Sequence, residues 1–395
     1  MTAGQEAVAR FESLLSGAGA RLLASLPREP LPPGEALRLG ARLRAAYPAE
    51  LVAAALQQHE LRFKARAKFT RAMEMFFTRA GLEQASAEIT AGHRAFRYAQ
   101  SGRVADLCCG IGGDLLALAA THEVLAVDTD PLALAVARAN AGVYGAAGRV
   151  TPRLGDARDV SLTGVEAVFI DPARRAGGRR LPSGESDPPL GWCLALAQRV
   201  AKVGIKAAPG VPRSVVPRGW ELEFISVGRA LKEAAAWSPA LATAPTRATV
   251  QPGGHSLIPA EGEPVGVRPP ADFLLDPDPA VTRAGLVEEL ARLTGSWKID
   301  ARIGFLASDR AVATPFARTL RVIDSAPWDQ RQLPARLRSL DIGAVDIRRR
   351  GLAGDVDALR RRLRLSGSRR ATLVMTRAQN RPWALVCLDV PAATP

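Results

Sequence analysis

One stretch of the sequence constrains the fold more than any other: residues 104–131, VADLCCGIGGDLLALAATHEVLAVDTDP. It begins with a short apolar run that carries one acid, Asp106, and continues into Gly110 and Gly112, where the backbone can turn and a ligand can reach the main chain. An apolar helix is predicted from Asp114, and residues 123–127 are predicted to form the next strand. The stretch therefore predicts a strand, a glycine turn, a helix and a second strand.

Two positions in this unit suit a nucleotide-like cofactor. The N-terminus of the helix predicted at Asp114 would place free N–H groups and the positive end of the helix dipole beside the turn, which favours an anion such as an amino-acid carboxylate. Asp128 ends the second strand, where an acid can accept hydrogen bonds from both hydroxyls of a ribose. A nicotinamide dinucleotide site is the competing interpretation, but Leu115 stands where the G-x-G-x-x-G fingerprint needs a small residue.

The next two predicted strands also end in acids. Residues 150–154 lead into Asp156, and residues 165–175 (VEAVFIDPARR) form a nearly continuous apolar strand, typical of a buried parallel sheet, that closes with Asp171 and Pro172. Open α/β sheets bind ligands at the carboxyl ends of their strands. We therefore expect one sheet edge to carry the four strand-end acids Asp106, Asp128, Asp156 and Asp171.

These motifs carry a resemblance. Residues 100–210 resemble class I S-adenosylmethionine-dependent methyltransferases, because the run 106–113, Asp128, the pair Asp156 and Ala157, and the pair Asp171 and Pro172 match that family's successive motifs in order. The resemblance implies an α/β, Rossmann-like sheet of seven strands and S-adenosyl-L-methionine as cofactor. It implies that the acid after the third strand binds the adenine amino group, and it assigns cofactor binding to Asp106, Gly110, Gly112, Asp128, Thr129, Asp156 and Ala157.

Two narrower likenesses point to RNA. The sequence DLCCGIGGD resembles the cofactor loop of trimethylguanosine synthase, and DPARRAGG resembles an element of RNA uracil-C5 methyltransferases. The predicted fifth strand, residues 203–207, and the two residues after it contain no cysteine, so methylation through a cysteine adduct is not expected. The Ser-Pro-Pro-Trp of the cap enzyme is Asp-Pro-Ala-Arg here, so cap specificity is not implied. Residues 222–227 and 247–250 are predicted to be the antiparallel pair that closes the sheet.

Composition limits the partners and the compartment. The formal net charge is +14 and the pI about 10.6, which favours a polyanionic partner, nucleic acid before membrane, although genome base composition can also enrich arginine. The cysteines show no metal-binding spacing, and two of the four are adjacent, which indicates a reducing compartment. We find no signal peptide and no apolar stretch of ~20 residues, and we expect a cytoplasmic protein.

We predict four segments: a helical N-terminal domain (1–95), the methyltransferase domain (96–260), a connector (261–319) and a small basic α+β domain (320–395). Between Arg331 and Arg381 there are fourteen arginines against four aspartates, which indicates a polyanion-binding face. This last segment resembles the THUMP-like domain of a group of bacterial methyltransferases. THUMP domains proper occur on tRNA-modifying enzymes, so the resemblance implies tRNA or rRNA as partner.

The sequence thus predicts a methyltransferase that acts on a base nitrogen of structured RNA. Asp171 and the Pro172 backbone are the predicted catalytic elements, because a carboxylate there can accept N–H bonds from the base. Substrate contacts are predicted for Arg174 and Arg175, in an arginine-rich loop, and for Lys206. The four histidines form no cluster, so no metal is expected. A protein or small-molecule methyltransferase and a non-catalytic RNA-binding adaptor are the alternatives.

Overall fold

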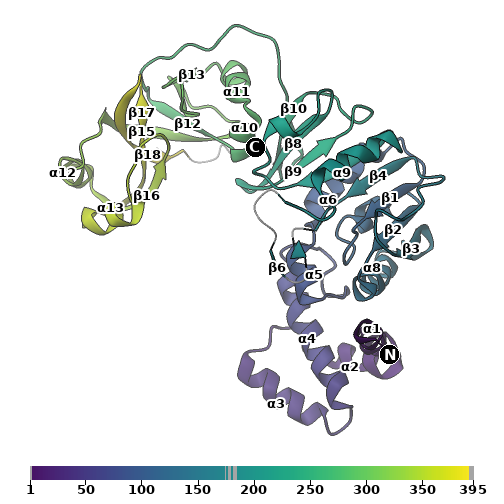
Figure 1. Cartoon of the computed structure of the whole chain (residues 1–395). Coiled ribbons are helices and arrows are strands. Elements are labelled where there is room, and N and C mark those ends of the chain that lie inside the picture. Colours follow the sequence, from purple (N-terminus) through teal and green to yellow (C-terminus); the bar gives the residue numbers. More distant parts are fainter. Residues whose placement is uncertain (1, 174, 177–178, 181–184, 391–395) are drawn as a thin grey trace. The chain divides into compact units, whose positions relative to one another are not determined.

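The computed structural model describes the chain except for residues 1, 174, 177–178, 181–184 and 391–395 (Figure 1). The described chain divides into two compact units. One comprises residues 1–221 and 234–243, and the other comprises residues 222–233 and 244–395. None of the described helices is long and apolar enough to cross a membrane.

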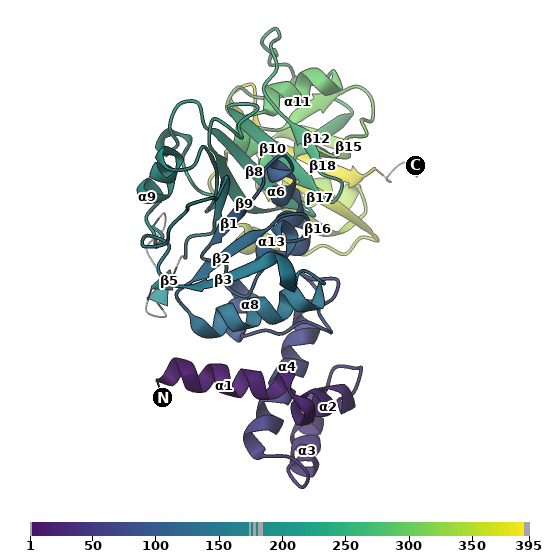
Figure 2. The same ribbon diagram turned by 90° about the vertical axis from the view of Figure 1, so that its right-hand side faces the viewer.

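The first unit begins with helices that pack onto the sheet domain rather than forming a separate body. Proline and threonine mark several of their starts: Thr2 caps the first helix with its hydroxyl, and Pro33 opens the third. Phe11 and Val52 share one hydrophobic core with Val136 of α8 (Pro131–Val143), and α1 packs against α8 (Figure 2). These helices are α1 (Ala3–Leu15), α2 (Gly17–Ser25), α3 (Pro33–Leu43), α4 (Ala49–Ala65), α5 (Arg79–Gln84) and α6 (Glu88–Ala95).

Five parallel strands form the centre of the main sheet, and β1 and β4 are buried throughout. Nearly continuous apolar sequence suits such strands, because both faces of a parallel sheet are covered. The strands are β1 (Val104–Leu107), β2 (Val124–Asp128), β3 (Val150–Leu154), β4 (Ala167–Ile170) and β7 (Lys202–Ala207). The helical elements between them are η1 (Phe96–Tyr98), α7 (Leu115–Leu118), α8 (Pro131–Val143), η2 (Ala147–Arg149), α9 (Leu190–Ala195) and η3 (Leu196–Gln198).

The sheet closes differently from the prediction. Its order is β11-β10-β8-β9-β7-β4-β1-β2-β3, and the strand antiparallel to β7 is β9 (Ala230–Trp237), which the sequence analysis missed. The two strands predicted as an antiparallel pair, β8 (Glu221–Val227) and β10 (Thr246–Gln251), pair with each other in parallel. The seven predicted strands, among them β8 and β10, are all present in this sheet, and β9 and β11 (His255–Leu257) are additional. A short 3-10 helix, η4 (Arg213–Val215), precedes β8.

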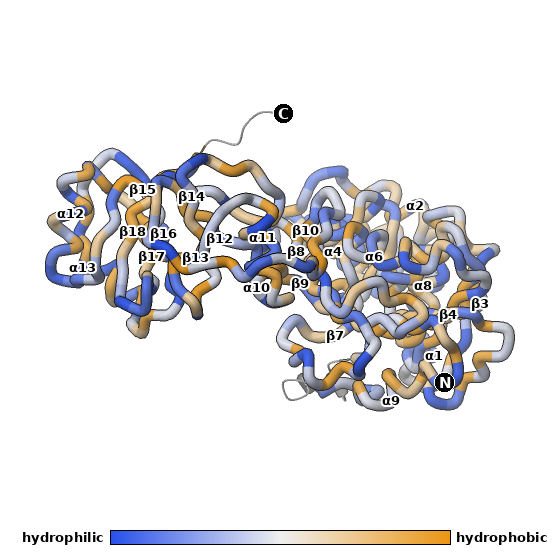
Figure 3. Tube along the Cα trace, turned by 90° about the horizontal axis from the view of Figure 1, so that it is seen from above, coloured by the Kyte–Doolittle hydropathy of each residue, from blue (hydrophilic) through white to orange (hydrophobic). Residues whose placement is uncertain are grey.

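A second sheet lies in the second unit, in the order β13-β14-β12-β15-β18-β17-β16. Its helices α12 (Leu333–Ser339) and α13 (Val356–Leu363) share one core with β16, β17 and β18, and Figure 3 shows hydrophilic residues along α13 and hydrophobic ones in β18. The strands are β12 (Phe273–Pro277), β13 (Trp297–Lys298), β14 (Leu306–Ser308), β15 (Ala317–Pro327), β16 (Ile342–Arg349), β17 (Arg369–Ala378) and β18 (Arg381–Asp389).

The predicted connector, residues 261–319, is therefore not a linker alone. Three of its segments, β12, β13 and β14, are strands of the second sheet, and β12 pairs with β15 from Phe273 to Pro277. It also contains two short helices, α10 (Pro279–Ala284) and α11 (Val287–Thr294). The basic α+β segment thus shares its sheet with residues that the sequence analysis placed outside it.

Candidate active site

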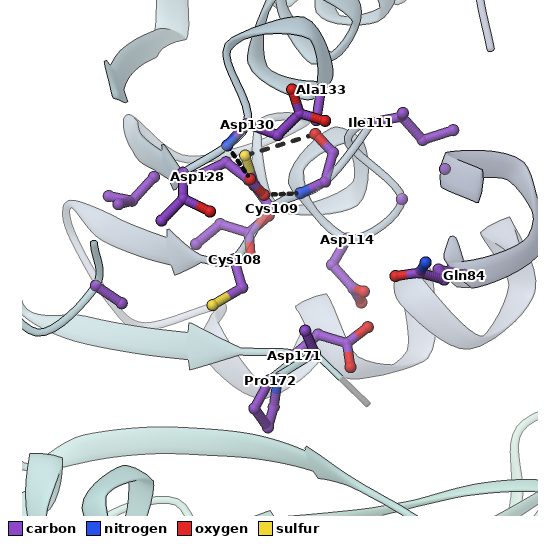
Figure 4. A pocket seen from close by; sticks show the side chains of 18 of the residues that line it. Gln84, Cys108, Cys109, Ile111, Asp114, Asp128, Asp130, Ala133, Asp171 and Pro172 are labelled. Atoms are coloured by element: carbon purple, nitrogen blue, oxygen red, sulfur yellow. Dashed lines mark hydrogen bonds between the residues drawn. The ribbon is translucent and has the colours of Figure 1, made fainter. Parts of the chain in front are cut away.

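A cavity of about 650 Å³ opens at the carboxyl ends of the parallel strands, within the size range of small-molecule sites (Figure 4). Main-chain bonds hold these strand ends together: Cys109 N–H donates to Val127, and Gly155 N–H donates to Asp128. All four predicted acids line the cavity. The structure therefore brings Asp106, Asp128, Asp156 and Asp171 to one place, as expected from the sheet topology.

The glycine loop after β1 needs its glycines at two positions. Gly110 and Gly112 have φ angles of +55° and +97°, a region that residues with a Cβ rarely adopt. Cys108, directly before them, also has a positive φ, of 63°. A non-glycine residue in this conformation stores local strain, and such strain gathers at functional sites.

Asp128 is held by the loop and by the start of α8. Its Oδ2 accepts a hydrogen bond from Gly110 N–H at 2.8 Å, and its Oδ1 accepts one from Asp130 N–H at 2.9 Å (Figure 4). Burial raises the pKa of Asp128 although these hydrogen bonds lower it. The backbone N–H of Thr129 also contributes to lowering this pKa, and Thr129 lines the cavity beside the carboxylate, which has acceptor capacity left. A ribose diol suits this carboxylate.

Asp106 is the most unusual group of the cavity. It is 1% exposed, and neither carboxylate oxygen has a hydrogen-bond partner among the described residues. Burial raises the pKa of Asp106 well above its usual range, and the negative charges of Asp114, Asp171 and Asp128 raise it further. Buried carboxylates normally have partners, so this orphan fits a cationic ligand group such as an ammonium. The residues present therefore fit the amino-acid end of S-adenosylmethionine.

The helix predicted from Asp114 is present but short. α7 has only four residues, and Asp114 makes no capping bond to it, so the predicted anion site at a helix N-terminus is not supported. Its carboxylate instead forms a buried ion pair with Arg94 of α6 and accepts a hydrogen bond from Ser86 at 2.6 Å. Burial raises the pKa of Asp114, but the charges of Arg94 and Lys206 outweigh it, so the pKa falls below its usual value.

Lys206 contacts Asp171 rather than open solvent. It is 7% exposed, and its Nζ lies 2.6 Å from Oδ2 of Asp171 and 2.9 Å from the Ser86 hydroxyl. Both residues line the cavity, and Figure 4 shows the carboxylate of Asp171 facing the side of Asp114 and Gln84. Lys206, predicted as a substrate contact, is thus a partner of the predicted catalytic acid.

Asp156 forms an ion pair that the sequence analysis did not predict. Arg158 pairs with Asp156 at 2.9 Å and with Asp187 at the same distance. The hydrogen bonds from Arg158 lower the pKa of Asp156, so that carboxylate is ionised. Ala157 is buried and lines the cavity next to it. The arginine thereby links the third strand end to the segment around Asp187.

The structure describes only part of the predicted arginine-rich loop. Pro172 is buried and lines the cavity. Arg174 lies outside the described residues. Arg175 is described only through its backbone, in the two-residue strand β5 (Arg175–Ala176), which pairs with β6 (Arg179–Arg180). The predicted substrate contacts of Arg174 and Arg175 remain predictions.

The N-terminal helices supply a wall that the sequence analysis did not predict. Residues of α5 and the turn after it line the cavity, among them Gly81, Gln84 and Ser86. The packing is tight, since a Cβ on Gly81 would lie 2.3 Å from Ile111, and one on Gly113 would lie 2.9 Å from Ser86 N. No local sequence signal marks these contacts, because they join segments that are far apart along the chain.

A sheet of this order, with a glycine loop and strand-end acids around one cavity, defines the class I methyltransferase fold. Comparison with known proteins agrees. The family model for RNA cap guanine-N2 methyltransferases matches residues 101–179, the THUMP domain-like model matches residues 317–388, and a domain of unknown function matches residues 7–65. A candidate methyltransferase of Porphyromonas gingivalis W83 has a similar structure, with a TM-score of 0.74 and 19% identity, covering 92% of this chain and 100% of that one.

A closer relative shows the family. An uncharacterized S-adenosylmethionine-dependent methyltransferase of Mycobacterium tuberculosis, found in two strains, is 39% identical over 312 residues, which cover 77% of this chain and 85% of the relative. The chain belongs to the S-adenosylmethionine-dependent methyltransferases. It is an enzyme, and S-adenosyl-L-methionine is its cofactor.

Proposed function

We propose that this methyltransferase modifies a nitrogen of a base in structured RNA, tRNA or rRNA. The observation that carries the proposal is Asp171 at the end of β4, with one carboxylate oxygen held by Lys206 and the other without a hydrogen-bond partner among the described residues. A base amine or ring N–H can donate to that second oxygen. The matches to models for RNA cap guanine-N2 methyltransferases and THUMP-like domains support RNA as the acceptor.

The cofactor would be held by residues from three strand ends. Asp106 would pair with its ammonium, Gly110 and Gly112 would present bare main chain, Asp128 and Thr129 would bind the ribose, and Asp156 with Ala157 would bind the adenine. When bound, S-adenosylmethionine supplies an electrophilic methyl group. The protein's part is to align the acceptor nitrogen with that methyl and to exclude water.

Asp171 and Gln84 form the acceptor side of the site in this proposal. Figure 4 shows the Gln84 amide directed toward Asp114 and Asp171, across the cavity from the glycine loop. An amide can donate and accept, so Gln84 and Asp171 together offer complementary contacts to one edge of a base. The carboxylate would hold the acceptor N–H and stabilise the positive charge that develops on nitrogen as the methyl is transferred.

The cysteines near the cofactor loop favour nitrogen over carbon as the acceptor. Burial raises the pKa of both Cys108 and Cys109 far above the usual thiol value, so neither is a thiolate at neutral pH. A carbon acceptor of the uracil-C5 type needs a thiolate that attacks the ring. Residues 203–209, where that nucleophile would lie, contain no cysteine.

The second unit offers a basic surface for the RNA backbone. Arg361 and Arg362 on α13 and Arg364 after it are exposed, and Arg361 lies near enough to Asp355 for its charge to lower the pKa of that carboxyl. They line one shallow depression with Ala358. Exposed guanidinium groups gathered at one end of a helix suit phosphate contacts.

Transfer of radiolabelled methyl from S-adenosylmethionine into total RNA from a strain without this protein tests the proposal. We expect label in one RNA species with the wild-type enzyme and loss of label with Asp171→Ala, while S-adenosylhomocysteine still binds to the variant. Asp159→Asn, at an exposed carboxylate outside the cavity lining, is the matched control and should keep activity. Unlabelled RNA from an enzyme that binds cofactor would contradict the proposal and favour a protein or small-molecule acceptor.

A further inference from the structure

A continuous chain of charged and hydroxyl groups joins the N-terminal helices to Asp171. Arg94 Nε donates to Oδ1 of Asp114 at 2.9 Å, and the Ser86 hydroxyl donates to Oδ2 of Asp114 at 2.6 Å. Lys206 Nζ donates to the Ser86 hydroxyl at 2.9 Å and to Oδ2 of Asp171 at 2.6 Å. We call these five residues the Ser86 network.

Chemistry fixes the direction of every bond in the Ser86 network. A protonated lysine can only donate and an ionised carboxylate can only accept, so the Ser86 hydroxyl must accept from Lys206 and donate its one proton to Asp114. The pKa of Asp114 lies below its usual value, because Arg94 and Lys206 outweigh the effect of burial, so the carboxylate is ionised. Among the described residues, the Ser86 hydroxyl is the only group with hydrogen bonds to both Lys206 and Asp114.

The Ser86 network is also buried and balanced in charge. Arg94, Ser86, Asp114 and Lys206 are each less than 9% exposed, and the Asp171 side chain, which lines the cavity, is 26% exposed. The positive charges of Arg94 and Lys206 balance the negative charges of Asp114 and Asp171. Removing one charged partner from such a set leaves an uncompensated charge, whereas removing the serine hydroxyl leaves all four charges in place.

Ser86 itself is held in position by backbone packing. It lies in the turn between α5 and α6, where its main-chain nitrogen approaches Gly113 so closely that a Cβ there would lie 2.9 Å away. The Arg94 guanidinium packs over the Phe169 ring, with 5.4 Å between its central carbon and the ring centroid, and Phe169 belongs to the strand that ends at Asp171. The N-terminal segment is thus attached to β4 by two routes.

We propose that Ser86 and Arg94 are positioning residues for methyl transfer: they fix Lys206, and Lys206 fixes Oδ2 of Asp171, so that Oδ1 faces the acceptor in one orientation. This inference rests on the role proposed for Asp171. Loss of the Ser86 hydroxyl frees the ammonium of Lys206 and lets the carboxylate rotate. Small misplacement of a reacting or orienting group costs on the order of 10- to 100-fold in rate.

The first test is a double-mutant cycle with Ser86→Ala and Lys206→Met, measured as single-turnover methylation of total RNA from a strain without this protein. We expect Ser86→Ala to lower the rate on the order of 10- to 100-fold and to change affinity for S-adenosylhomocysteine by less than about threefold. In the Lys206→Met background, Ser86→Ala should have little further effect, because the two residues act through one contact.

Thr90→Val is the matched control. Thr90 is a buried hydroxyl residue of the neighbouring α6, and its Oγ1 donates only locally, to Ala87 at 3.0 Å. This variant should keep the wild-type rate. Arg94→Lys should retain more activity than Arg94→Met, because the lysine keeps the positive charge beside Asp114. Independent, additive losses from Ser86→Ala and Lys206→Met would overturn the proposal.

A second test does not depend on the acceptor. The chain has six lysines, so acetylation by N-hydroxysuccinimidyl acetate can be followed at each one by mass spectrometry. Lys206 should be protected in the wild type and in Thr90→Val, and it should react at least about tenfold faster in Ser86→Ala. Equal protection in Ser86→Ala would show that Ser86 does not hold Lys206. If no RNA is methylated, the proposed function fails, while this labelling still decides whether the Ser86 network holds Lys206.

Discussion

Gly110 donates its main-chain N–H to Oδ2 of Asp128 across 2.8 Å, which ties the glycine loop after β1 to the acid at the end of β2. Asp128 therefore has two functions in this site: it shapes the loop and it faces the position proposed for the ribose. A substitution at Asp128 is expected to disturb both.

Asp128→Ala should raise the Kd for S-adenosylhomocysteine on the order of 100-fold, since hydrogen bonds to a charged group contribute about 1.5–3 kcal/mol each. Asp128→Asn should cost less, because its amide oxygen can still accept one bond. Isothermal titration calorimetry measures both. Asp159→Asn, at an exposed aspartate nearby, is the control. Wild-type affinity in Asp128→Ala would refute the assignment.

Asp106→Asn should stabilise the free protein and weaken cofactor binding. Burial raises the pKa of Asp106 in the folded state well above the ordinary aspartate value of about 3.9, so the folded protein prefers the protonated acid and loses stability as the pH rises above that value. The variant lacks this loss, so its gain in unfolding free energy should grow with pH, to about 1–3 kcal/mol once Asp106 is ionised, and its Tm advantage over the wild type should grow in parallel. Thermal unfolding at pH 5 and pH 8 measures it, and a Tm advantage that shrinks with pH would contradict the assignment.

The same variant should bind S-adenosylhomocysteine more weakly, on the order of tenfold, because its amide cannot pair with the ligand's ammonium. The wild type should release a proton when the ligand binds at a pH where Asp106 is protonated. Calorimetry in buffers of different ionisation enthalpy detects that proton. An unchanged Kd in the variant would show that Asp106 does not meet the ammonium.

Arg97→Met should destabilise the protein by about 3–5 kcal/mol, because it removes a guanidinium that forms an ion pair with the buried Glu221 carboxylate. The side chain of Glu221 is 0% exposed, and its hydrogen bond from Thr243 N–H carries no positive charge. Urea unfolding measures the change. Arg79→Met, which removes an exposed pair with Glu60, should cost less than about 1 kcal/mol. Equal losses in the two variants would contradict this account.

Replacing Arg361, Arg362 and Arg364 by alanine should weaken RNA binding and leave cofactor affinity unchanged. Each lost phosphate contact should reduce the slope of log K against log salt by about 1. Filter binding across a salt series measures the slope. Substitution of Arg38, Arg42 and Arg44, three exposed arginines of α3 and its C-cap, removes the same charge elsewhere. A similar slope change in that control would mean that RNA binding depends on total charge rather than on α13.

Local patterns were enough to predict the strands and acids of the cavity. Each of Asp106, Asp128, Asp156 and Asp171 follows or ends an apolar run, and parallel topology brings such ends together. β9 escaped prediction because its sequence, ALKEAAAW, is rich in alanine, which has low strand propensity. The two strands pack closely: a Cβ on Gly204 of the neighbouring β7 would lie 2.5 Å from Trp237 of β9.

The partners of the acids could not be predicted from the sequence. Ser86 and Lys206 are 120 residues apart, and neither belongs to a motif that names the other. The three strands 273–308 were missed for a related reason, since each is two to five residues long and gains its stability only by pairing in the second sheet. Secondary-structure propensity is a property of one segment of the sequence. The partners of the acids and the short strands of the second sheet depend on residues that are distant along the chain.

Because α5 and the turn after it form one wall of the cavity, the catalytic sheet cannot be transferred between proteins by itself. A gene fragment that begins at residue 96 would encode every strand of the catalytic sheet and all four strand-end acids, yet it would lack Gln84, Ser86 and Arg94. Such a fragment would expose Ile111 and the glycine loop to water and remove the Arg94 partner of Asp114. Recombination that exchanges only the sheet between relatives would therefore transfer a cofactor platform without a working enzyme, so α5 and α6 should be inherited together with the sheet.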